Sequence, residues 1–247
     1  MNAWLWLLCL ALPALVPAAI PEDAALNRDC VVLLHGLGRS TASMKRLEWT
    51  LARRGYQVVN LAHPSTRLSV EHLAREHLAP AVQQIALRPG GRIHFVTHSF
   101  GGIVLRQYLS ENLLTNLGRV VMLGPPNQGS AVADRLKNNP FYQWSTGPAG
   151  QQLGLRSEDL PRRLGPVKFS LGVIAGDRSF NPFFSRLLRG PDDGKVSVAS
   201  TRVEGMSDFV VVPVSHTWLM WRRTVLNQVF TFLETGRFRD RKTTSLN

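Results

Sequence analysis

Short apolar runs alternate with longer amphipathic stretches over the first half of the chain, and this alternation restricts the fold more than any other feature. The apolar runs are rich in Leu and β-branched residues and fall at residues 30–34, 56–61, 92–97 and 120–123. Residues 43–54, 69–85 and 101–113, which lie between the runs, carry apolar side chains at helical spacing. Buried strands alternating with helices predict an α/β fold, with a doubly wound, mostly parallel sheet covered by helices on both faces.

The alternation lapses after residue 123. Residues 138–165 are rich in Pro, Gly, Gln and aromatic residues without a clear period, and we interpret them as a small cap-like insertion. Beyond it, the pattern predicts strands at residues 167–175 and 209–214 and a closing helix at residues 217–233. A chain of 247 residues with 44% hydrophobic residues can bury one core of this kind, so residues 19–247 are expected to form a single domain.

Residues 1–18 are an apolar segment without a charged side chain. Its length matches the hydrophobic region of a signal peptide, and two prolines within it would break a membrane-spanning helix. Small residues at positions 16 and 18 favour cleavage before Ala19, which predicts a protein exported to the periplasm or secreted. The alternative is an uncleaved membrane anchor, because no Lys or Arg lies near the first residue.

The chain is strongly basic. It has 29 Lys and Arg against 17 Asp and Glu, a formal net charge of +12. Such a field favours anionic surfaces, for example a membrane rich in anionic phospholipid headgroups. Residues 237–242 form the densest basic run, which is more typical of a solvated tail than of a nucleic-acid interface, so nucleic-acid binding is not expected.

A serine lies between a predicted strand and a predicted helix, within Thr-His-Ser-Phe-Gly-Gly at residues 97–102. A nucleophile elbow holds its serine in an unfavourable backbone conformation, which requires small residues two positions before and two positions after it. Gly101 meets the second requirement, and Thr97 stands where glycine is usual. The context of strand, serine and helix therefore identifies Ser99 as a candidate nucleophile.

With its flanking residues, this motif resembles the elbow of lipases and esterases of the α/β-hydrolase family, and the resemblance spans roughly residues 30–233. His-Gly-Leu-Gly at residues 35–38 is similar to the lipase oxyanion loop, and Gly-Pro-Pro-Asn-Gln-Gly-Ser at residues 124–130 is similar to the segment after the next strand in many bacterial lipases. The resemblance implies an oxyanion hole made by the backbone N–H groups of Leu37 and Phe100.

A serine at its ordinary pKa is a poor nucleophile and needs a general base. In this fold the chain order is serine, acid, then histidine. His216 is the one of the seven histidines that comes late, directly after the strand predicted at residues 209–214. His98 is next to the serine in sequence, but a side chain at that position of a sharp turn is expected to point elsewhere. We therefore predict that His216 is the base.

Two carboxylates lie in suitable places for the third member of a triad. Asp177 directly follows the strand predicted to end at residue 175, a common place for the acid. Asp193 lies in an Asp-Asp-Gly-Lys-Val segment that resembles the acid-bearing segment of many lipases. We favour Asp193 and keep Asp177 as the alternative, although Asp-Gly and Gly-Asp are also ordinary turn sequences.

These residues predict a serine hydrolase that cleaves carboxylic esters through an acyl-enzyme, without a cofactor or metal. Aromatic residues of the cap and of residues 180–184 suit lipid-like esters if they line an acyl pocket or a lid, and they could equally be ordinary packing. The alternatives are an acyltransferase that uses the same triad and excludes water, and a non-catalytic binding protein of the same fold. The second alternative usually lacks the serine or the histidine, and both are present here.

Overall fold

The structure, a computed structural model, describes residues 29–239. The predicted signal peptide or anchor at residues 1–18 and the predicted cleavage before Ala19 lie outside the described residues. Among residues 29–239, no helix is both long and apolar enough to cross a membrane.

Six parallel strands form the sheet, in the order β2-β1-β3-β4-β5-β6. Their bounds are Cys30–Leu34 (β1), Gln57–Leu61 (β2), Ile93–His98 (β3), Leu117–Leu123 (β4), Leu171–Gly176 (β5) and Asp208–Val212 (β6). From β1 the chain adds β2 on one side of it and then crosses over to add β3 on the other side. The direction of winding therefore changes between β1 and β3. Open α/β sheets bind ligands outside the carboxyl ends of the strands at such a switch point. The predicted doubly wound α/β fold is confirmed.

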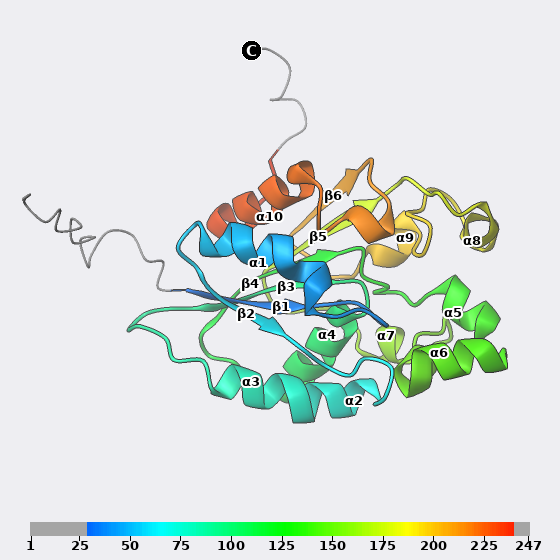
Figure 1. The fold of residues 1–247 in the computed structure, drawn as a ribbon, viewed down its shortest axis with the longest axis horizontal. Coiled ribbons are helices and arrows are strands. Elements are labelled where there is room, and N and C mark those ends of the chain that lie inside the picture. The colour runs from blue at the N-terminus through cyan, green and yellow to red at the C-terminus, as the bar shows by residue number, and fades with distance from the viewer. Residues whose placement is uncertain (1–28, 240–247) are drawn as a thin grey trace, which may run out of the picture.

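Helices cover both faces of the sheet (Figure 1). One face carries α1 (Lys45–Ala52), with the 3-10 turn η1 (Thr41–Met44) before it, and α10 (Arg223–Thr235). The other face carries α2 (Val70–His72), the π-helical segment η2 (Leu73–Leu78), α3 (Ala79–Gln83) and α4 (Gly101–Glu111). Successive β1 side chains alternate between two apolar layers, since Val31 packs with α1 and α10 while Val32 packs with α4.

The helices that follow β4, apart from α10, gather at the carboxyl end of the sheet (Figure 1). They are α5 (Ala131–Leu136), α6 (Pro140–Gln151), α7 (Leu160–Arg163), α8 (Pro182–Leu187), α9 (Val198–Thr201) and the 3-10 turn η3 (His216–Trp218). The segment interpreted as a cap, residues 138–165, contains α6 and α7. Helix α6 kinks at Gly147, where φ is 61°, and Pro148 follows. Gln152 fastens this segment to α2, because its Nε2 donates to Glu71 Oε2 at 2.7 Å.

Several predicted boundaries differ from the observed ones. The helix predicted at residues 217–233 begins at Arg223, because residues 216–218 form a 3-10 turn instead. The strand predicted from residue 167 begins at Leu171. The helix predicted at residues 43–54 begins at Lys45, because residues 41–44 form a 3-10 turn in which the Ser43 hydroxyl donates to the Ser40 carbonyl. The helix predicted from residue 69 begins at Val70, and the Ser69 side chain caps it by accepting from the His72 N–H.

Candidate active site

Ser99 occupies the turn between β3 and α4 with φ of 54°, and no other non-glycine residue among residues 29–239 has a positive φ. This left-handed conformation costs about 1–2 kcal/mol for an L-residue. Its N–H donates to the Leu123 carbonyl at 2.8 Å, which ties the turn to the end of β4. The strand, the strained serine and the helix together have the geometry of a nucleophile elbow.

Glycines allow the elbow to approach the loop after β1. A Cβ atom on Gly101 would lie 2.7 Å from the Leu34 carbonyl oxygen, and one on Gly36 would lie 3.3 Å from Ser99 Cβ. Both distances are shorter than ordinary contacts, so a larger residue at either place would displace the backbone or the serine. The two loops therefore lie in contact across the switch point of the sheet.

Thr97, the departure from the usual glycine, is accommodated by the glycine at position 102. A Cβ on Gly102 would lie 3.3 Å from Thr97 Oγ1 and 3.1 Å from Met122 Sδ. Thr97 is fully buried, and its hydroxyl makes no hydrogen bond within the described residues. The Thr97 side chain, two positions before Ser99, thus occupies space that the absence of a side chain at Gly102 leaves open.

Ser99, His216 and Asp193 form one hydrogen-bonded chain. His216 Nε2 lies 2.9 Å from Ser99 Oγ, and His216 Nδ1 lies 2.7 Å from Asp193 Oδ2. Both partners of the second bond are buried, with His216 3% and Asp193 2% exposed. These distances fit a hydroxyl that donates to Nε2 and an Nδ1–H that donates to the carboxylate. The backbone N–H of His216 also donates to the Asp193 carbonyl at 2.9 Å.

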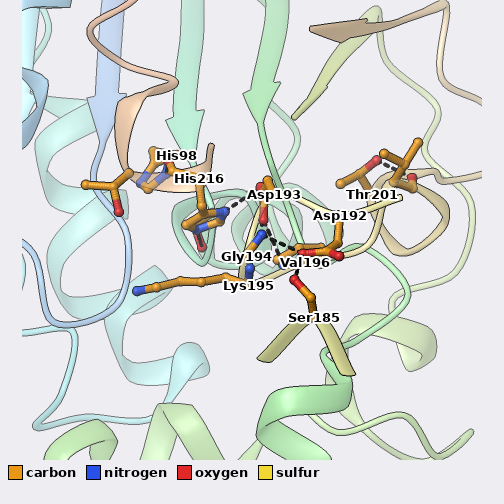
Figure 2. A network of polar contacts seen from close by, with 12 residues as sticks. His98, Ser185, Asp192, Asp193, Gly194, Lys195, Val196, Thr201 and His216 are labelled. Carbon is orange, nitrogen blue, oxygen red and sulfur yellow. Dashed lines mark hydrogen bonds and ion pairs between the residues drawn. The ribbon is translucent and has the colours of Figure 1, made fainter. Parts of the chain in front are cut away.

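A polar turn holds the Asp193 side chain in place (Figure 2). Asp193 Oδ1 accepts from the N–H of Lys195 at 3.0 Å and from the N–H of Val196 at 2.9 Å, which leaves Oδ2 for His216. The preceding Asp192 accepts from the Gly194 N–H at 2.7 Å. The turn fixes the carboxylate through the backbone, as a group that must orient an imidazole requires.

Asp177, the alternative acid, does not contact His216. Its nearest cation is Arg178, whose Nε lies 3.9 Å from Asp177 Oδ1, and its N–H donates to the Val212 carbonyl. Asp177 and Asp193 nevertheless both lie near the carboxyl end of β5. A Cβ on Gly176, at the end of β5, would lie 2.9 Å from Asp193 Cβ. The chain after Asp177 thus makes an excursion through α8 and returns Asp193 to the end of the same strand.

His98 lies closer to the site than sequence reasoning expected. Its Nε2 lies 3.1 Å from the His216 carbonyl oxygen, and the two rings are 4.7 Å apart between centroids. Burial and the neighbouring His216 hold the pKa of His98 well below its ordinary value, so the ring is neutral. A neutral ring that donates through Nε2 secures the loop that carries His216. No motif in the sequence predicts that the His98 side chain contacts the loop that carries His216.

The loop after β1 and the elbow after β3 each present one of the two amides expected to form the oxyanion hole. The N–H groups of Leu37 and Phe100 make no hydrogen bond to any group among residues 29–239. The neighbouring Gly38 has φ of 64° and donates its N–H to Ser65 Oγ at 3.0 Å, which anchors the loop. Both amides border the cavity that contains Ser99.

A cavity of about 250 Å³ is lined by Ser99 and His216. Apolar side chains from the elbow and from the segment of α5 and α6 line much of it, namely Leu37, Phe100, Pro126, Val132, Ala133, Leu136, Tyr142 and Leu153. Tyr142 and Phe184, two of the aromatic residues noted in the sequence, reach this cavity. The others do not pack in the core, since Phe141, Trp144, Phe180 and Phe183 are between 64% and 82% exposed.

Two cations also line the cavity, Arg39 and Lys195, and sequence analysis did not single them out. Among residues 29–239, no group of three or more His, Cys, Asp or Glu side chains has the arrangement of a metal site. Cys30 is buried in β1 and unpaired, and burial raises the pKa of its thiol to about 11. The ionisable groups described at the cavity are therefore the hydrogen-bonded chain of Ser99, His216 and Asp193, together with His98 and the two cations.

Comparison with known proteins shows which proteins this chain is similar to. The lysosomal thioesterase PPT2 of Rattus norvegicus is 28% identical over 246 residues, covering 84% of this chain and 77% of the relative. The mature Bacillus licheniformis lipase BlEst2 has a similar structure, with a TM-score of 0.64 and 19% identity over 87% of this chain and 93% of the lipase. Phospholipase PlaB from Legionella pneumophila has a TM-score of 0.61 and 20% identity, covering 76% of this chain and 53% of PlaB.

The sequence profile of the alpha/beta hydrolase family matches residues 31–226, most of the described chain. The match spans the elbow, the loop after β1 and all three members of the hydrogen-bonded chain. The resemblance seen in the sequence is confirmed, and the chain belongs to the alpha/beta hydrolase family.

Proposed function

We propose that the protein is a carboxylic ester hydrolase in which Ser99 is the nucleophile, His216 the general base and Asp193 the acid. The observation that carries this proposal is the continuous hydrogen-bonded chain from Ser99 Oγ through His216 to Asp193 Oδ2, built on a serine with strained backbone. A non-catalytic protein has no need of this strain, which is stored where it serves a mechanism.

The reaction follows from the distances. Ser99 Oγ attacks the acyl carbon while its proton passes to His216 Nε2, and the carbonyl oxygen becomes an oxyanion that accepts from the N–H groups of Leu37 and Phe100. The bond from carbon to the leaving group then breaks, and His216 returns the proton to the departing alcohol. Water, deprotonated by His216, attacks the acyl-enzyme and releases the acid together with Ser99. Asp193 holds the imidazole in the required tautomer throughout.

The apolar cavity supports substrates with a hydrocarbon acyl chain. Solved structures of similar fold include a lipase, and the curated relatives include lysosomal thioesterases. A thioester is the second candidate substrate, favoured by the 28% identity to such a thioesterase. The same triad serves both, because the thioester carbonyl is attacked in the same way and a thiolate leaves more readily than an alkoxide.

The surface around the cavity supports action at a lipid assembly. Four strongly exposed aromatic residues lie on or beside α6 and α8, namely Phe141, Trp144, Phe180 and Phe183. Exposed aromatic side chains and a formal net charge of +12 suit contact with anionic phospholipids. Export of the chain through the segment at residues 1–18 would place the enzyme at such a surface.

A panel of p-nitrophenyl esters of increasing chain length tests the proposal. Ser99→Ala is expected to lower kcat on the order of 10⁶-fold, because nucleophile and base act as one unit. The exposed serine variant Ser157→Ala should retain wild-type rates. A fluorophosphonate probe should label wild type at Ser99, and labelling at another serine would refute the assignment. Product analysis with an added alcohol distinguishes transfer from hydrolysis, and an ester as the main product would identify an acyltransferase.

A further inference from the structure

We propose that the substrate carries an anionic group, such as a phosphate, on its leaving group, and that Arg39 and Lys195 bind it. This inference rests on the proposed hydrolase function and adds a class of substrate to it. Both side chains line the cavity that contains Ser99 and His216, from the loop after β1 and from the turn of the acid.

The two cations have no carboxylate partner. Among residues 29–239, neither forms an ion pair within 4 Å, and the one side-chain hydrogen bond of Arg39 is from Nη2 to Thr217 Oγ1 at 3.3 Å. No Asp or Glu side chain lines the cavity. Asp193, the nearest acid along the chain, already has both oxygens in hydrogen bonds to His216 and to the backbone. The cavity therefore has an excess of positive charge, and side-chain N–H groups of Arg39 and Lys195 are free to donate hydrogen bonds to a ligand.

The two charges lie close enough to affect each other and the elbow. Loss of solvation beside the cavity and the charge of Arg39 lower the pKa of Lys195, and the charge of Asp193 offsets this only in part. Both cations also act on His98, where they reinforce the effect of burial in keeping its pKa low. Like charges that converge without an anion repel each other, and an anionic ligand between them would relieve this repulsion.

The positions of the cations indicate which part of the substrate they meet. Arg39 is bonded to Thr217, the residue after His216. Figure 2 shows the Lys195 side chain extended past His216, away from Asp192. His216 must protonate the leaving group, so the leaving group lies on its side of Ser99. The hydrocarbon-lined part of the cavity, with Val132 and Leu136 of α5, is left for the acyl chain.

Space for a leaving group larger than a simple alcohol adjoins the cations. Arg39 also lines a second cavity, of about 590 Å³. The other residues that line it include Gly38, Thr217, Trp218 and Trp221. A group that leaves Ser99 on the His216 side would pass Arg39 into this second cavity. The arrangement fits an acyl ester or thioester of a phosphate-bearing alcohol or thiol.

Three thioesters with one acyl chain test the inference. S-butyryl derivatives of 2-mercaptoethanesulfonate, 2-mercaptoethanol and thiocholine have anionic, neutral and cationic leaving groups, and the released thiol is followed with Ellman's reagent. Wild type is expected to show a kcat/KM about tenfold higher for the anionic thioester than for the neutral one, with the cationic thioester slowest. The preference should shrink as NaCl is raised.

The double variant Arg39→Gln, Lys195→Gln should bring the ratio of anionic to neutral kcat/KM close to one. The matched variant Arg46→Gln, Lys168→Gln removes the same net charge from exposed positions elsewhere and should keep the wild-type ratio. Using a ratio within each variant separates recognition of the anion from any general loss of activity. A double variant that keeps the preference would overturn the assignment of these two residues.

Further outcomes separate this inference from the proposed function. Hydrolysis of all three thioesters at equal kcat/KM would refute the anion site and leave the hydrolase intact, whereas no hydrolysis of any ester would refute the hydrolase itself. A preference for S-succinyl-2-mercaptoethanol, whose anion is on the acyl side, would show that the cations face the acyl chain. Inhibition by inorganic phosphate that is equal for all three thioesters, without a leaving-group preference, would indicate a site for free phosphate and overturn the proposal.

Discussion

The two halves of the domain position catalytic groups by different physical means. From β1 to β4, the elbow is held by apolar packing and by glycines in close contact with β1. From β4 to His216, polar side chains fix the backbone. Four of the five helices in this region have an N-cap side chain that accepts a hydrogen bond from a backbone N–H group, namely Ser130, Asn139, Asn181 and Ser197. The nucleophile thus depends on packing, and the acid depends on hydrogen bonds.

Of the changes that test this comparison, the largest effect is expected at Asp193, where the polar turn can be kept while the charge of the carboxylate is removed. Asp193→Asn retains an oxygen to accept from the N–H groups of Lys195 and Val196, but its amide cannot stabilise the tautomer and charge that His216 needs. We expect kcat to fall about 10⁴-fold. Asp177→Asn is the matched control and should stay close to wild type, since Asp177 is not bonded to His216.

Ester hydrolysis by the two variants, together with their denaturant midpoints, checks this prediction. The reverse ranking of Asp193→Asn and Asp177→Asn would show that the hydrogen bond between His216 and Asp193 does not support catalysis. A large drop in stability of Asp193→Asn would instead show that the charge holds the turn itself.

The next effect concerns packing in the first half. Gly101→Ala places a Cβ 2.7 Å from the Leu34 carbonyl oxygen, and forcing this contact apart should lower the free energy of unfolding by about 3 kcal/mol. Gly190→Ala, in the second half, has φ of 78° but no neighbour within 4 Å of the new Cβ, so it should cost about 1 kcal/mol through backbone strain alone. Urea denaturation with an unchanged m value measures both.

An equal decrease in the free energy of unfolding of Gly101→Ala and Gly190→Ala would contradict the distinction between the two halves. It would show that backbone strain, and not close contact, determines the loss of stability. A Gly101→Ala protein of normal stability but low activity would place the effect at the serine alone.

The smallest effect involves a buried imidazole of the packed half. His63 stacks on His35 with ring centroids 3.8 Å apart, and burial, with the charge of His35, lowers the pKa of His63 to about 3. Below its ordinary pKa of 6.5, the unfolded chain binds a proton that the folded chain does not, so this residue makes stability fall as pH falls from about 6.5 toward 3. The expected slope is about 1.4 kcal/mol per pH unit.

Chemical denaturation at pH 6 and pH 5 measures this linkage. His63→Phe should flatten the difference between the two pH values, and the exposed His72→Gln should leave it unchanged. Equal pH dependence in wild type and His63→Phe would mean that His63 does not contribute to the acid sensitivity.

Much of the sheet could be predicted because its strands are buried on both faces and read as continuous apolar runs. Cys30–Leu34 was expected at its observed bounds. The helix expected at residues 217–233 shows why boundaries fail, since the apolar residues after His216 continue the helical pattern while the backbone forms a 3-10 turn. Similarly, the apolar run from Val167 is typical of a strand, but the N–H of Val167 donates to the Glu204 carbonyl, which lies outside the sheet.

The parts of the candidate site with local signatures were also accessible from sequence. Ser99 has its glycines, and Asp193 has a turn sequence around it. His98, Arg39 and Lys195 have no such signature, because their relation to the site depends on which strand ends lie side by side. Sequence order alone could not reveal that the carbonyl of His216 lies 3.1 Å from His98 Nε2.

The separation of the apolar interior into two layers has a consequence for how activity is lost. Phe100, next to Ser99, belongs to the layer of α4, while Leu219 and Met220, just after His216, belong to the layer of α1 and α10. Proteins open in cooperative units smaller than the whole domain, and each layer is a natural unit of this kind. If either layer opens, we expect Ser99 and His216 to separate even while the strands stay paired. We therefore expect inactivation on warming to precede the loss of the sheet.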